Sequence, residues 1–63
     1  MGAVKPADYP LLVTTWVNGL GRETYRAWTW DEAHRVDQTM RELGWHLDAS
    51  ISREQAYLAE MTP

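Results

Sequence analysis

The sequence predicts a small α+β domain, in which a three-stranded, mostly antiparallel sheet in a β-β-α-β order carries one main helix on one face and a short C-terminal helix follows. Three observations predict this class. An Asn18-Gly19 pair, the strongest short-range hairpin signal, separates two segments of strand-forming residues. A capped segment with helical periodicity follows, and a segment that alternates with a period of two comes after it.

Length and composition limit how this domain is stabilised. The 63 residues include four tryptophans and no cysteine, so disulfides cannot support the core. Chains of about 60 residues bury only about 60% of their unfolded surface, and small domains commonly gain stability by oligomerisation. The net charge of −3 has the wrong sign for a typical nucleic-acid binder. We expect an extended arm over residues 1–10, where Pro6 and Pro10 disfavour regular structure, and a single domain over residues 11–63.

The first two strands are predicted over residues 11–17 and from about residue 20 or 22 to residue 28, where β-branched and aromatic residues are concentrated. Two hairpin registers fit the sequence. A two-residue loop pairs Val17 with Leu20, whereas a four-residue loop pairs Val17 with Arg22. Both loop lengths are even, so both registers place the same residues on the same face. In either loop we expect glycine to supply a positive φ.

The segment from Thr29 to Leu43 is predicted to form the main helix. Thr29 and Glu32 are spaced as a capping box, in which each side chain binds the backbone amide of the other residue. Gly44 is expected to end the helix in a left-handed conformation, with Trp45 closing a Schellman motif. The apolar stripe of this helix is narrow and consists of Ala33, Val36, Met40 and Leu43.

The segment from Trp45 to Ser52 alternates between apolar and polar residues, which predicts a third strand. Ser52 and Gln55 are spaced as a second capping box, which favours a short helix from Arg53 to about Met61. A fourth strand over the same residues is the alternative. The inward-facing residues of the third strand are expected to be Trp45, Leu47, Ala49 and Ile51.

Strand alternation divides the hairpin residues between two faces of the sheet. The stripe of the main helix needs an apolar face to cover. One face supplies it with Leu11, Val13, Val17, Thr24 and Trp28. The opposite face then exposes Leu12, Trp16 and Tyr25, which we predict to be the partner-binding residues, because large exposed aromatic residues mark interaction sites.

Motifs that resemble catalytic signatures are better explained by local structure. Residues 31–34 spell D-E-A-H, but the chain lacks the phosphate-binding loop of helicase motors, and acidic residues suit a first helical turn. His34 and His46 are too few for a typical zinc site. Ser50, His46 and Asp48 would lie on one face of one strand, where a catalytic triad cannot converge. We therefore predict no enzyme activity, no metal site and no cofactor.

These observations favour a small non-enzymatic protein-interaction module, such as an accessory protein, inhibitor, adaptor or assembly subunit, that binds another protein or itself. A cytoplasmic location and no membrane partner are predicted, because we find no signal peptide and no apolar run long enough to span a bilayer. The residue bias is typical of a high-GC genome, and a bacteriophage accessory protein is the setting that we favour. Two alternatives stay open: single-stranded nucleic-acid binding with Trp16 and Tyr25 stacked on bases, and a small metal-dependent enzyme.

Overall fold

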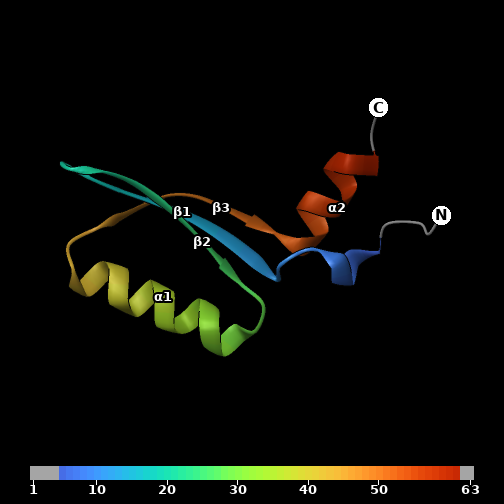
Figure 1. The fold of residues 1–63 in the computed structure, drawn as a ribbon, viewed down its shortest axis with the longest axis horizontal. Coiled ribbons are helices and arrows are strands. Elements are labelled where there is room, and N and C mark those ends of the chain that lie inside the picture. Colours follow the sequence, from blue (N-terminus) through green and yellow to red (C-terminus); the bar gives the residue numbers. More distant parts are fainter. Residues whose placement is uncertain (1–4, 62–63) are drawn as a thin grey trace.

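The computed structural model describes residues 5–61 and confirms the predicted α+β class (Figure 1). Three antiparallel strands form one sheet in the order β2-β1-β3, so β1 is central and both other strands are edges. The elements in chain order are the 3-10 helix η1 (Pro6–Asp8), β1 (Leu12–Asn18), β2 (Gly21–Ala27), α1 (Trp30–Glu42), β3 (His46–Ser52) and α2 (Arg53–Met61). Within the predicted extended arm, residues 6–8 are therefore wound into a 3-10 turn, and residues 1–4 lie outside the described part of the chain.

The hairpin adopts the second of the two predicted registers. Val17 pairs with Arg22, and Asn18 pairs with Gly21 one step further, which leaves residues 19–20 at the tip. The predicted positive φ at a hairpin glycine is wrong, because Gly44 is the only described residue with a positive φ. The Asn18 side chain closes the turn instead: its Oδ1 accepts from the backbone N–H groups of Leu20 at 2.8 Å and Gly21 at 2.9 Å.

Both predicted capping boxes form. The Thr29 hydroxyl accepts from the Glu32 N–H at 3.1 Å, and the Glu32 carboxylate accepts from the Thr29 N–H at 3.1 Å. The Ser52 hydroxyl and the Gln55 side chain exchange the same two bonds at the start of α2, so residues 53–61 form a helix and the alternative of a fourth strand is wrong.

The C-terminal end of α1 also closes as predicted. Gly44 has a φ of 86°, its N–H bonds to the Arg41 carbonyl at 3.1 Å, and the Trp45 N–H bonds to the Met40 carbonyl at 2.9 Å. These two bonds are those of a Schellman motif, which satisfies carbonyl groups that the last turn of a helix leaves free.

A β-bulge in β3 breaks the alternation predicted for the third strand. Thr15 pairs with Ala49, but the next residue of β1, Trp16, pairs with Leu47, so Asp48 is the extra residue. Leu47 therefore shares a face with Trp16, while Ala49 lies on the opposite face. The expectation that all apolar residues of β3 point to one side is wrong for this reason.

The two helices lie on different sides of the sheet. Figure 1 shows α1 along one side of the strands, while α2 rises from the other side at the end away from the hairpin tip. At that end η1 and α2 contact each other, with the Tyr9 and Tyr57 rings edge to face at 6.3 Å between centroids. The Arg53 Nε donates to the Tyr9 carbonyl at 2.9 Å and fixes the chain preceding β1 against α2.

Candidate functional site

The predicted orientation of the sheet is reversed in the structure, and this decides where a binding surface lies. Helix α1 covers the face that carries Trp16, which is 0% exposed, and not the face of Val13 and Val17. The predicted exposure of Trp16 is therefore wrong. Leu12 and Tyr25, the other two predicted partner-binding residues, lie on the same covered face and are half-buried.

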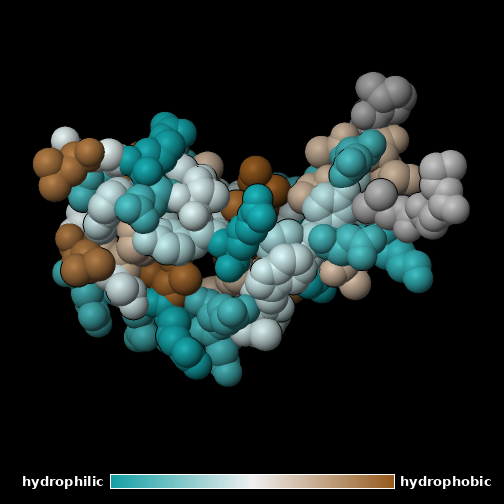
Figure 2. Space-filling view, in the orientation of Figure 1, coloured by the Kyte–Doolittle hydropathy of each residue, from teal (hydrophilic) through white to brown (hydrophobic). Residues whose placement is uncertain are grey.

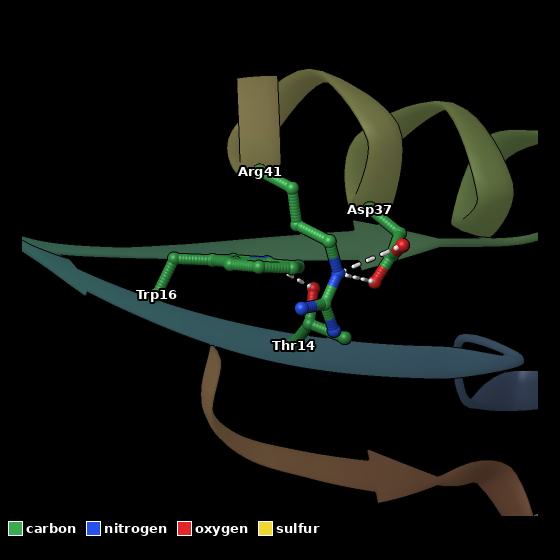
Figure 3. Close-up of polar contacts among 4 residues, drawn as sticks. All are labelled: Thr14, Trp16, Asp37 and Arg41. Atoms are coloured by element: carbon green, nitrogen blue, oxygen red, sulfur yellow. Dashed lines mark hydrogen bonds and ion pairs between the residues drawn. The ribbon is translucent and has the colours of Figure 1, made fainter. Parts of the chain in front are cut away.

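Trp16 is held on this face by contacts on its edge and over its ring (Figure 3). Its indole N–H donates to the Thr14 hydroxyl at 2.9 Å, which satisfies the polar group of a buried ring. The Arg41 guanidinium of α1 lies 5.5 Å from the ring centroid, and Asp37 accepts from the Arg41 Nε at 3.1 Å. A large ring with a hydrogen-bond partner fills the space under α1 in a way that the smaller valines cannot.

The opposite side of the sheet, here called the uncovered face, is the candidate functional site. Helix α1 lies on the other side, and α2 meets the sheet through β3, at the end of the sheet away from the hairpin tip. The registers of the three strands define its residues. They are Val13, Thr15 and Val17 of β1, Arg22, Thr24 and Arg26 of β2, and His46, Ala49 and Ile51 of β3.

The centre of the uncovered face is apolar. Val13 pairs directly with Ile51, and Val17 lies on the same side four residues further along β1. Ile51 is 48% exposed, and the valines are half-buried. The only polar residues within this centre, Thr15 and Thr24, bond to each other through their hydroxyl groups at 3.3 Å. The face therefore offers β-branched side chains to a second layer, as the inner face of a sandwich does.

Charged groups lie at the rim of the uncovered face. The Arg22 guanidinium of β2 reaches the Asp48 carboxylate of β3 at 3.3 Å, so an ion pair joins the two edge strands across β1 near the hairpin. Asp48 is the bulge residue, and this contact places its carboxylate on the uncovered side. Both side chains are well exposed, so the pair contributes little to the stability of one chain.

The two edges of the sheet are poor sites for strand addition. Natural proteins protect edge strands with charged residues and bulges. The edge strand β2 carries Arg22, Glu23 and Arg26, and the edge strand β3 carries the bulge at Asp48. The face of the sheet, rather than either edge, is the surface that a partner reaches without opposing these features.

Two shallow apolar clefts lie elsewhere on the molecule. One, of about 200 Å³, lies between α1 and Tyr25 of β2. The other, of about 290 Å³, lies where η1, the start of α1 and the start of α2 meet, and Trp30, Leu11 and Tyr57 line it. Neither brings together the nucleophile, base and oxyanion donors of an active site. No group of three or more histidine, aspartate or glutamate side chains within residues 5–61 is arranged to hold a metal ion.

The chain as a whole exposes more surface than its mass predicts. Among the described residues, only Trp16, Ala27 and Met40 are buried. Figure 2 shows strongly hydrophobic residues at the hairpin end of the viewed surface and towards its middle. Large apolar side chains that are strongly exposed include Leu20, Leu43, Trp28 and Trp30. No described helix is both long and apolar enough to cross a membrane.

Comparisons with known proteins add no family to this description. The chain matches no protein-family model, no curated protein and no solved structure. The surface that we consider functional therefore comes from the geometry of the chain alone.

Several residues of the uncovered face were expected in the core. Val13 and Val17 were predicted to lie under the main helix, and Ile51 was predicted to face the same side as Leu47. The pattern of β1 offered no signal to choose between its two faces, since both are partly apolar. Ile51 and Leu47 lie on opposite faces because of a bulge between them, and no local sequence motif predicts that bulge.

Proposed function

We propose that this chain is a small protein-interaction module whose partner packs on the uncovered face. One observation carries the proposal: the apolar sheet face with Val13, Val17 and Ile51 is not covered by α1, and α2 stands beside it at the end of β3 away from the hairpin tip. Sheets are stable when their apolar faces pack against another layer, and exposed apolar patches mark interaction sites. This surface replaces the predicted set of Leu12, Trp16 and Tyr25.

The composition of the face supports a protein as the partner. Its centre is formed by aliphatic and threonine side chains, and its charges lie at the rim, which is the arrangement of a protein–protein interface. Nucleic-acid binding was predicted to use Trp16 and Tyr25 stacked on bases. Trp16 is 0% exposed, and Tyr25 is half-buried on the same covered face, so neither ring lies on the uncovered face. We therefore favour the protein-interaction function.

The test is a charge placed on each side of the same strand. Ile51→Lys puts an ammonium group on the uncovered face, whereas Ser50→Lys puts the same group on the other side of β3, at an exposed position. A partner that co-purifies with the wild-type chain from its native source is identified, purified and titrated against all three proteins by calorimetry. We expect Ile51→Lys to weaken binding by about thirtyfold or more, the size of an interface hot spot, and Ser50→Lys to bind as the wild type does.

Thermal unfolding of both variants is the control for folding, because each substitution lies on an edge strand and should leave the fold intact. Equal affinities of the folded Ile51→Lys and Ser50→Lys proteins for the partner would contradict the proposal.

A further inference from the structure

We infer that the occupant of the uncovered face is a second copy of this chain, so that two sheets pack face to face around a two-fold axis. This inference rests on the proposed function and names its partner. It produces four layers in the order α1, sheet, sheet, α1, with the α2 helix of each copy at the end of the sheets away from the hairpin tips. Isologous dimers of this kind are the commonest oligomers of soluble proteins.

The excess exposed area of the chain is similar to the area that each partner buries in such a dimer. The chain exposes 4944 Å², whereas a compact protein of 7.3 kDa exposes about 4,200 Å². The excess of roughly 700–800 Å² is close to the ~800 Å² that each partner buries in a standard interface. An interface of standard size with a second copy is therefore of the order of the surplus that this chain exposes.

The shape of the chain agrees with this area. Its radius of gyration is 13.4 Å, compared with about 11 Å for a compact chain of this length. Its extents of 42 × 25 × 16 Å describe an elongated molecule, and the view down its shortest axis shows α1 beside the strands and not in front of them (Figure 1). The helix and the sheet are therefore stacked across the long axis, and a second copy on the uncovered face adds a layer in the same direction.

The charges at the rim select one of two possible arrangements. A two-fold axis parallel to the strands places β2 of one copy over β3 of the other, because the sheet order is β2-β1-β3. Arg22 then faces Asp48 of the second copy, and the same contact occurs twice. An axis across the strands would instead place β2 over β2, with Arg22 facing Arg26 of the second copy. Like charges in such an interface are costly, so the first arrangement is favoured.

In the favoured arrangement the centre of the interface is apolar. The central strands cross near Thr15, and Ile51 lies against the aliphatic stem of Arg26 from the second copy, since both residues are level with Val13. Sheet twist sets the two strand directions about 30° apart.

Sedimentation equilibrium tests the inference on the complete chain. We expect the wild type and Ser50→Lys to approach twice the 7.3 kDa monomer mass at concentrations of about 100 µM, and Ile51→Lys to stay monomeric. A monomeric wild type would overturn the second copy as occupant. The calorimetric titration of a heterologous partner would then decide the proposed function separately.

The orientation is tested by mixing two charge-reversal variants, Arg22→Asp and Asp48→Arg. Each variant alone places like charges at both rim contacts, and we expect its dimer to be weakened about tenfold or more. In an equimolar mixture both contacts regain opposite charges, so heterodimers should form with nearly wild-type affinity. An ion pair that acts only within one chain cannot give this rescue. Failure of the mixture to dimerise, while the wild type does, would overturn the arrangement with β2 over β3.

Discussion

The two faces of the sheet carry different side chains, and the difference explains which one the helix covers. The covered face has Trp16, whose ring is enclosed by α1 and whose N–H is satisfied by Thr14. The uncovered face has Val13 and Ile51, which are apolar but smaller. The helix therefore packs on the face with the single largest apolar residue. The face that remains has a smaller apolar centre of β-branched side chains, and we propose that it packs against another chain.

The largest expected effect comes from removing the ring of the covered face. Trp16→Ala should destabilise the fold by about 3–5 kcal/mol, the range for a buried tryptophan, and a domain this small should then be largely unfolded at 25 °C. Circular dichroism and denaturant titration measure the loss. Trp28→Ala is the matched control, because Trp28 is 49% exposed and its removal should leave the fold in place.

Equal stabilities of the two tryptophan variants would contradict the assignment of Trp16 to the core. The sheet would then face the other way, with Trp16 available to a partner.

Two adjacent threonines in β1, one on each face of the sheet, allow a second comparison with smaller expected effects on stability. Thr14→Val removes the acceptor of the buried Trp16 N–H and should cost about 1–3 kcal/mol, because an unpaired buried donor loses its hydration without compensation. Thr15→Val makes the same change on the uncovered face, where the Thr15–Thr24 hydrogen bond is exposed. Its effect should stay within about 0.5 kcal/mol, since valine also suits a strand. Chemical denaturation of both variants, compared at equal m-values, provides the measurement. A larger loss for Thr15→Val would reverse the comparison.

The ends of the elements could be predicted from the sequence because their causes are local. The Thr29 and Glu32 side chains find each other across three residues, and Gly44 supplies the left-handed conformation that closes α1. These contacts form between neighbours in the chain, so residue type and spacing are sufficient to locate them. The same is true of the Ser52 capping box at the start of α2.

The orientation of the sheet could not be predicted because its cause is tertiary. Both faces of β1 are partly apolar, so alternation allows either one to be buried. The choice depends on how Trp16 fits beneath α1, whose Arg41 lies over the ring and is more than twenty residues away in the chain. The bulge at Asp48 depends likewise on the pairing of β3 with β1. The fold class was correct, but the predicted exposure of Trp16 and the predicted single apolar side of β3 were wrong, each for one of these reasons.

A smaller effect on stability is expected at the C-terminal end of α1, the helix that covers the Trp16 face. It tests whether that helix depends on the Schellman motif. Gly44→Ala should destabilise the chain by about 1 kcal/mol, because alanine resists the φ of 86° that the Schellman motif requires. Gly19→Ala is the matched control: it lies at the hairpin tip with open space around its Cβ position and without a positive φ. Thermal unfolding measures both. A melting temperature for Gly44→Ala equal to that of Gly19→Ala would show that the closure of α1 does not depend on this conformation.

The smallest effect concerns Tyr25, at the edge of the covered face, where its hydroxyl donates to the Glu23 carboxylate at 2.6 Å. This hydrogen bond is the main cause that raises the pKa of Tyr25 above 10.0, followed by desolvation and by the negative charge of Glu23. Because the folded chain holds the phenolic proton more tightly than the unfolded chain does, the contribution to stability is present below pH 10 and is lost as the pH rises through the higher pKa of the folded state. Absorbance titration of tyrosinate, with Tyr25→Phe to identify the transition, should show a lower pKa for Tyr25 in the Glu23→Gln variant. An unchanged titration in that variant would contradict the hydrogen bond from the Tyr25 hydroxyl to Glu23.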